Sequence, residues 1–182
     1  MDLLQTMNTL MVEPAKVDSS ASGVEWSEQS FAARLATLGP EARAEVVAAI
    51  PDELASRLRY EWWFWARPKQ LPPPGDDWFV WLLKPGRGFG KTRTGSEWIH
   101  SRGMAGNERR EMVLVGKTPA DVRDFQLEGP AGILNVAHPA ERPEYQPSNR
   151  LLVWPTGAKA HIRSGANPEE LRGFGGDTAW LD

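Results

Sequence analysis

The sequence predicts an α/β fold with a mostly parallel sheet, preceded by a small helical module. The apolar run at residues 78–83 is followed at once by a glycine-rich loop and a helix-compatible run at 92–102. A second apolar run, at 112–116, has the composition of another buried strand. Upstream, apolar residues recur at helical spacing between residues 26 and 66. This order of strand, loop, helix and strand is typical of α/β proteins.

The composition is that of a globular chain. Its 182 residues suffice for one domain plus a small appendage. Charged residues make up 25% and hydrophobic residues 41%, and nine tryptophans argue against disorder. The formal charge of −3 does not indicate the basic surface that is usual in nucleic-acid-binding proteins. Contact with DNA would therefore depend on a few local lysines and arginines.

Several protein classes are disfavoured. The longest apolar run, residues 78–83, is far shorter than the roughly 20 residues needed to cross a bilayer. Residues 1–14 carry an acid at Asp2 and no basic cluster, so they do not have the pattern of a secretory signal, and we expect a cytoplasmic protein. The absence of cysteine removes disulfides and thiolate metal sites, and the three histidines lack ligand spacing.

The chain is expected to have three parts. Residues 1–25 show no periodicity and are predicted to form a mobile tail. Residues 26–66 are predicted to form a module of three short helices. Residues 67–77 contain four prolines and a glycine, so they form a linker or an ordered loop. The α/β part is assigned to residues 67–182.

The second half of the chain shows further local signals. Thr118 is a predicted helix N-cap. Residues 151–163 have the pattern of a β-hairpin. Asn167 and Glu170 have the spacing of a capping box for a short helical turn. Residues 178–182, TAWLD, are predicted to form an apolar strand that ends in an acid.

The loop GRGFGKT, residues 86–92, matches most of the phosphate-binding loop pattern. Gly88 and Gly90 allow backbone conformations that turn successive N–H groups inward around an anion. Lys91 is expected to reach the β- and γ-phosphates of ATP, and the Thr92 hydroxyl is expected to ligate Mg²⁺. The residues predicted to contact nucleotide are Gly86, Arg87, Gly88, Phe89, Gly90, Lys91 and Thr92.

The loop departs from the pattern at one position, because its first glycine is replaced by Pro85. Gly86 is available for the turn instead. The alternative is an ordinary glycine-rich turn before a helix, but the strand and helix around the loop favour phosphate binding.

Asp182 stands at the tip of the predicted strand at residues 178–182. An acid in this place can hold Mg²⁺ and its water in a nucleotide-hydrolysing enzyme. Alone, it would be better explained as a turn aspartate at the end of a strand. Combined with the loop at residues 86–92, it is predicted to be the acid on the metal side.

Five stretches of the chain resemble, in this order, stretches of phage and prophage large terminases, including those of gene transfer agents. They lie between about residues 59 and 182 and read RPKQLPPPGDDW, LLKPGRGFGKTRTGSEW, LVGKTPADVRDFQLEGPAGIL, RPEYQPSNRLLVWPTGA and NPEELRGFGGDTAWLD. The resemblance implies a P-loop NTPase sheet of the ASCE type that hydrolyses ATP to drive double-stranded DNA into a procapsid. Residues 67–182 would be the N-terminal part of this ATPase domain.

The resemblance also implies roles for individual residues. Gln70 corresponds to the adenine-side glutamine, Arg87 to the phosphate-loop arginine and Asp182 to the first residue of the acid pair. Arg172 is implied as an arginine finger that reaches ATP in a neighbouring subunit. The alternatives are a solvated amide for Gln70, a solvated charge for Arg87, and for Arg172 a helix cap or a surface pair with Glu169.

In the family, a glutamate follows the aspartate that corresponds to Asp182, and a nuclease domain comes later. Neither is present in these residues, so we expect a sheet that is incomplete and a chain that does not hydrolyse ATP. The partners implied for the intact protein are double-stranded DNA, a portal and a small terminase subunit. A homo-oligomeric ring on the procapsid is also implied, and no membrane.

Two other functions remain open from the sequence. A helicase-like translocase of another P-loop family would share the loop and the acid, but not the stretches RPEYQPSNRLLVWP and NPEELRG. A non-catalytic remnant would bind a partner through the helical module at residues 26–66.

Overall fold

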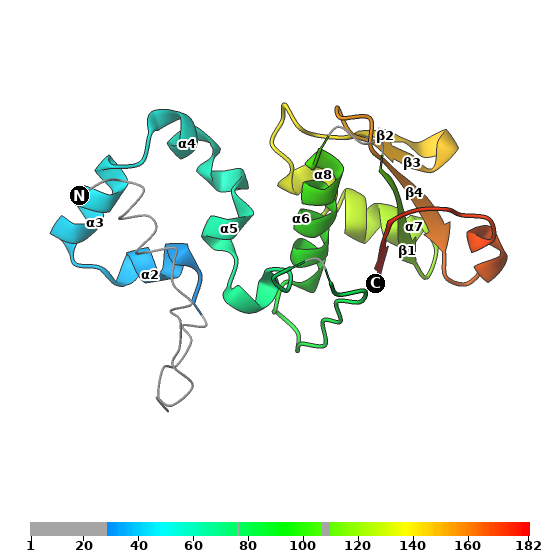
Figure 1. Cartoon of the computed structure of the whole chain (residues 1–182), viewed down its shortest axis with the longest axis horizontal. Helices are drawn as coiled ribbons and strands as arrows, with labels where there is room; N and C mark the ends of the chain where they lie inside the picture. Colours follow the sequence, from blue (N-terminus) through cyan, green and yellow to red (C-terminus); the bar gives the residue numbers. More distant parts are fainter. Residues whose placement is uncertain (1–28, 76, 107–109) are drawn as a thin grey trace. The chain divides into compact units, whose positions relative to one another are not determined.

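The computed structural model describes residues 29–75, 77–106 and 110–182 (Figure 1). The chain divides into two compact units, Met1–Pro73 and Pro74–Asp182. The tail predicted at residues 1–25 lies outside the described residues. None of the helices in the described ranges is both long and apolar enough to cross a membrane.

The described part of the first unit consists of short helices. The first begins after Ser30, whose Oγ accepts a hydrogen bond from the N–H of Ala33 at 3.1 Å. Phe31 is buried, and its ring lies 5.0 Å from that of Phe64. The described part of residues 26–66 is helical, but the third of the three predicted helices is divided into several short segments. The described helical segments are α2 (Phe31–Thr37), α3 (Pro40–Ala48), α4 (Asp52–Arg57), η1 (Leu58–Tyr60) and α5 (Trp62–Trp65), followed by η2 (Pro68–Gln70).

The second unit combines helices with a sheet. Its longest helix is α6 (Lys91–Met104), which begins directly after the glycine-rich loop. The other helical segments are α7 (Pro119–Asp121), the π-helix η3 (Val122–Leu127), α8 (Ile133–Val136), η4 (Pro147–Asn149) and η5 (Pro168–Leu171). The strands are β1 (Glu111–Gly116), β2 (Glu144–Gln146), β3 (Leu151–Val153), β4 (Lys159–Ser164) and β5 (Thr178–Leu181).

The five strands lie in the order β2-β3-β4-β1-β5. Strand β1 pairs in parallel with β4 and β5, whereas β3 pairs antiparallel with β2 and β4. The sheet is therefore mixed, and the prediction of a mostly parallel sheet is wrong. The turn between β3 and β4 is too short for a parallel crossover, so the predicted hairpin itself brings antiparallel pairing. Strand β2, which the sequence analysis did not identify, adds the second antiparallel pair.

Residues 78–83 do not form the predicted strand. Phe79 is 99% exposed, whereas the Trp78 and Trp81 rings each lie 6.2 Å from the ring of Trp98 in α6. A strand needs a neighbour that satisfies its N–H and C=O groups, and the described residues provide none here. The tryptophans of this segment pack against a helix instead.

The core lies on the face of the sheet that α6, η3 and α8 cover. Met112 and Leu114 alternate along β1 and stand opposite Ala160 and Ile162 of β4. All four are buried in one cluster. Figure 1 shows α6 and α8 next to the sheet. The helical residues of the same cluster are Ile99, Val122, Leu127 and Ile133.

Thr118 caps α7 as predicted. Its Oγ1 accepts a hydrogen bond from the N–H of Asp121 at 3.1 Å, and the Asp121 carboxylate accepts one from the N–H of Thr118 at 2.9 Å. The capping box predicted at Asn167 is wrong in detail. Asn167 makes no side-chain cap bond to the backbone of η5, and its amide nitrogen donates to the Glu170 side chain at 3.3 Å.

Candidate functional site

The glycine-rich loop adopts the backbone conformations that its glycines were predicted to provide. Gly88 has a φ of 79° and Gly90 a φ of 86°. Both values lie in the left-handed region that other residues rarely adopt. A Cβ atom at Gly88 would meet nothing within 4 Å, so glycine is required here by backbone conformation and not by crowding.

Helix α6 begins at Lys91, and its N-cap residue Gly90 has no side chain that could cap the first turn. The first hydrogen bond across this end runs from the N–H of Thr94 to the carbonyl of Gly90, at 2.9 Å. In α-helices generally the first-turn N–H groups lack a partner within the helix, and this end carries the positive pole of the helix dipole. Such an end favours an anion.

The side chains at the loop and at the start of α6 suit a phosphate group. Lys91 and Arg87 are exposed, and Thr92 and Phe89 are half-buried. Ammonium and guanidinium groups donate charge-assisted hydrogen bonds to phosphate, and a hydroxyl can ligate Mg²⁺. These residues, together with the two left-handed glycines, fit a nucleotide phosphate with its metal ion.

Asp182 follows β5 and is exposed. Its N–H donates to the carbonyl of Val115 at 3.1 Å, so the parallel pairing with β1 continues beyond the end of the strand. Asp182 therefore belongs to the same unit as the loop and α6.

Arg172 lies between η5 and β5 with its side chain 80% exposed. Its Nε is 2.9 Å from a carboxylate oxygen of Glu169, which is the surface pair weighed from the sequence. A pair this exposed contributes little free energy. The next residues are held more firmly, since the Phe174 ring lies 5.4 Å from that of His161 and His161 Nε2 lies 2.7 Å from Glu111.

Gln70 belongs to the first unit and is buried, with 6% of its surface exposed. Its side-chain oxygen accepts hydrogen bonds from the backbone N–H and the Nε of Arg67, at 3.0 and 3.1 Å. The reading of Gln70 as a solvated amide is therefore wrong. Its contact with adenine remains a prediction.

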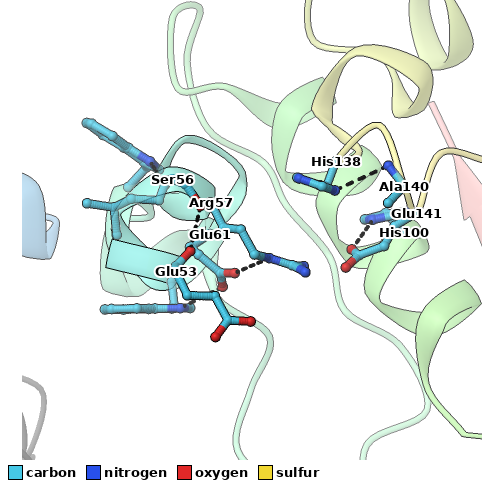
Figure 2. Close-up of polar contacts among 11 residues, drawn as sticks. Glu53, Ser56, Arg57, Glu61, His100, His138, Ala140 and Glu141 are labelled. Carbon is cyan, nitrogen blue, oxygen red and sulfur yellow. Dashed lines mark hydrogen bonds and ion pairs between the residues drawn. The ribbon is translucent and has the colours of Figure 1, made fainter. Parts of the chain in front are cut away.

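His100, in the second half of α6, lies next to polar residues of the segment that follows α8. His100 is 9% exposed, and its Nε2 lies 3.7 Å from a carboxylate oxygen of Glu141. Burial lowers the pKa of His100, and the nearby Glu141 carboxylate opposes that shift. Figure 2 shows this pair together with His138, whose Nδ1 accepts a hydrogen bond from the N–H of Ala140. Figure 2 also draws polar contacts of the first unit, where Arg57 pairs with Glu61.

Sequence reasoning missed a contact between α6 and β5. A Cβ atom built on Gly95 would lie 2.3 Å from the indole of Trp180, and one built on Gly103 would lie 2.5 Å from the indole of Trp154. Glycine inside a helix is destabilising by about 1 kcal/mol relative to alanine. Gly95 within the predicted helix was the signal that something packs closely against it, whereas Gly103 lies just beyond the predicted range.

The fold and the site define an α/β protein in which a glycine-rich loop leads into a helix and a strand of the same unit ends at an acid. Residues 82–182 match the family described as terminase large subunit, T4likevirus-type, N-terminal. The match covers more than half of the 182 residues, and the chain belongs to this family. The resemblance to phage large terminases is thus confirmed. No curated protein and no solved structure matches the chain.

Proposed function

We propose that this chain is the ATP-binding part of a large terminase, the motor that packages double-stranded DNA into a procapsid. The observation that carries the proposal is the loop at residues 86–92. It combines two glycines in left-handed conformations with a helix that begins at Lys91, directly after Gly90. The family of the chain supports the role in packaging.

Three residues would bind the phosphates and the metal ion. Lys91 would neutralise charge on the β- and γ-phosphates, and Thr92 would supply a hydroxyl ligand to Mg²⁺. Asp182 would hold the metal's water from the end of β5. Thr92 and Asp182 would hold Mg²⁺, which would supply positive charge against the charge that develops during phosphoryl transfer.

Other residues would assist binding or turnover. Arg87 would contact phosphate from within the loop, since a guanidinium matches the geometry of phosphate oxygens. Gln70 would contact adenine, and Arg172 would act on ATP held by a neighbouring subunit. The high exposure of Arg172 suits a residue that reaches outward.

The proposed partners are double-stranded DNA, a portal and a small terminase subunit, in a homo-oligomeric ring on the procapsid. The support for these partners comes from the family alone. The same family match weighs against a helicase-like translocase of another kind. No feature of the described residues specifically favours a non-catalytic remnant.

The test is ATP binding by the purified chain in the presence of Mg²⁺, measured by calorimetry. Lys91→Ala should weaken binding about tenfold to a hundredfold, because a hydrogen bond to a charged group contributes about 1.5–3 kcal/mol. The matched control is Lys84→Ala, which removes another exposed lysine shortly before the loop and should bind as the parent does. Parent-like affinity in Lys91→Ala, or no ATP binding by the parent, would contradict the proposal and favour the remnant.

A further inference from the structure

The indole of Trp180 rests directly on Gly95 of α6. A Cβ atom at Gly95 would lie 2.3 Å from Cε2 and 2.5 Å from Cζ2 of Trp180. Real Cβ contacts are never this short, so the ring occupies the space that any larger residue at position 95 would need. Trp180 is also packed against the buried core cluster of the unit.

Each residue of the contact shares a face with one residue of the proposed site: Trp180 with Asp182 on the sheet, and Gly95 with Lys91 on α6. Trp180 and Asp182 are two positions apart at the end of β5, so their side chains project from the same side of the sheet. This is the core side, because Trp180 is in register with Leu114 of β1. Lys91 and Gly95 are four positions apart and share one face of α6.

Helix α6 runs antiparallel to the parallel strands of the sheet. Its Gly103 lies against Trp154, in the turn that leads to the start of β4, whereas Gly95 lies against Trp180 near the end of β5. The beginning of α6 and the end of β5 are therefore at the same edge of the unit. In Figure 1 the C-terminus lies at the level of the first turn of α6.

The distances from this contact to the two proposed site residues are nearly equal. Asp182 lies two residues beyond Trp180, about 6.6 Å along a strand. Lys91 lies four residues before Gly95, about 6 Å along a helix. Asp182 and Lys91 both lie towards the same edge of the unit from the contact of Trp180 with Gly95. The acid and the start of α6 therefore lie at the same level along the direction of the strands.

We propose that Trp180 and Gly95 are positioning residues, which set the distance between Asp182 and the phosphate-binding start of α6. The inference rests on the proposed function, because it assigns Asp182 and Lys91 to one nucleotide site. Neither Trp180 nor Gly95 contacts the nucleotide in this arrangement. Their contact prepares the metal side of the site before Mg²⁺ arrives.

The chain provides a matched control at the other end of the same helix. Gly103 is packed against Trp154 as closely as Gly95 is against Trp180, since a Cβ atom there would lie 2.5 Å from the indole. Gly95→Ala and Gly103→Ala therefore introduce the same methyl group against the same kind of ring. Only Gly95→Ala should change the geometry at the start of α6.

The first measurement is the gain in ATP affinity that Mg²⁺ brings, determined for each variant with Mg²⁺ and with a chelator. Gly95→Ala should reduce that gain about tenfold or more, which corresponds to about 1.4 kcal/mol, because the added methyl group displaces Trp180 and with it Asp182, and should leave affinity without Mg²⁺ near the parent value. Gly103→Ala should keep the gain. Trp180→Leu, which lacks the atoms that the methyl group would meet, should restore part of the gain when combined with Gly95→Ala.

The second measurement needs no nucleotide. The sequence has no cysteine, so Lys91→Cys and Asp182→Cys introduce the sole sites for a pair of nitroxide labels. The distance between the labels, measured by electron paramagnetic resonance, should change or broaden in Gly95→Ala and stay unchanged in Gly103→Ala.

The outcomes separate this inference from the proposed function. If the parent shows no gain in ATP affinity from Mg²⁺, or if Asp182→Asn keeps the full gain, the proposed role of Asp182 in metal binding, and with it this part of the proposed function, is contradicted. If the parent shows a gain that Asp182→Asn removes, but Gly95→Ala matches Gly103→Ala in both measurements, the positioning role is overturned. A Gly95→Ala variant that does not fold leaves the decision to Trp180→Leu alone, which should broaden the label distance and lower the gain.

Discussion

The indole N–H of Trp154 donates a hydrogen bond to Nδ1 of His100 across 3.1 Å, and both residues are buried. Because Nδ1 accepts this bond, the neutral His100 ring carries its proton on Nε2, on the side of Glu141. Protonation of His100 would place a second donor against the indole N–H. The contact therefore depends on a neutral histidine.

Stability should decrease in acid because of His100. Burial lowers its pKa in the folded chain, whereas the unfolded chain keeps a value of about 6.5. As the pH falls below about 6.5, the unfolded state takes up the proton first, so the contribution of His100 to stability is lost from there down to the folded pKa. We expect a loss of up to about 1.4 kcal/mol per pH unit, measured by urea unfolding between pH 7.5 and 5.5.

The control for this prediction is a variant that cannot titrate. His100→Asn keeps an acceptor for Trp154, and its unfolding free energy should depend less on pH than that of the parent. His138→Asn removes a different histidine, and its side-chain oxygen can still accept from the N–H of Ala140. Equal pH slopes for the parent and His100→Asn would contradict the prediction.

The cap at Thr118 offers a second test. Its Oγ1 accepts from the N–H of Asp121 and donates to the Asp121 carboxylate at 2.7 Å. Thr118→Ala should lower the free energy of unfolding by about 1 kcal/mol, since it leaves an N–H of the first turn without its partner. Thr118→Ser keeps the hydroxyl and should cost only a few tenths of that. Chemical denaturation measures both, and equal losses would show that the methyl group matters and not the cap.

Packing at Gly103 allows a third prediction. Gly103→Ala forces a methyl group against Trp154 and should lower the free energy of unfolding by about 1–3 kcal/mol, although alanine is the better helix former. Gly175→Ala is the control, since a Cβ atom there meets nothing within 4 Å. Thermal and urea unfolding should place Gly175→Ala close to the parent. A Gly103→Ala chain that is more stable than the parent would show that the ring moves aside at no cost.

Local signals predicted much of the second unit. The helix after the loop, the strand before Thr118, the cap itself and the hairpin all depend on residues close in sequence, and all are present. The apolar run at residues 78–83 failed as a strand, because strand formation depends on a partner that local sequence cannot reveal. The mixed character of the sheet has a different origin, because both antiparallel pairs join strands that are neighbours in sequence: the predicted hairpin already implies one of them, and β2, which was not identified, adds the other.

In the candidate site, too, features that depend on neighbouring residues could be predicted, whereas a contact between distant residues could not. The conformations of Gly88 and Gly90 could be predicted, because the loop pattern demands them. The contact of Trp180 with Gly95 could not, since it joins residues 85 positions apart that no motif relates. Only the presence of a glycine within a helix indicated that a neighbour approaches there.

The exposure of Arg172 leads to the last prediction, which concerns the full-length large terminase. The Arg172 side chain is 80% exposed and is paired only weakly with Glu169 on the surface. If it acts on ATP in a neighbouring subunit, it stabilises charge in the transition state and contributes much less to ground-state binding. Arg172→Ala should then lose about a thousandfold or more in turnover and keep its affinity for ATP.

Mixing of variants decides whether Arg172 acts between subunits. A subunit with Lys91→Ala cannot use its own ATP site but still offers Arg172 to its neighbour, and a subunit with Arg172→Ala retains an intact loop. Mixed rings should therefore recover part of the ATP turnover that each variant alone lacks, measured as phosphate release at increasing mixing ratios. The control is Glu169→Gln, which removes the surface pair and should keep parental turnover, because the pair is not required for the reach of Arg172. If mixed rings show no recovery at any ratio, Arg172 acts within its own subunit or supports the loop before β5.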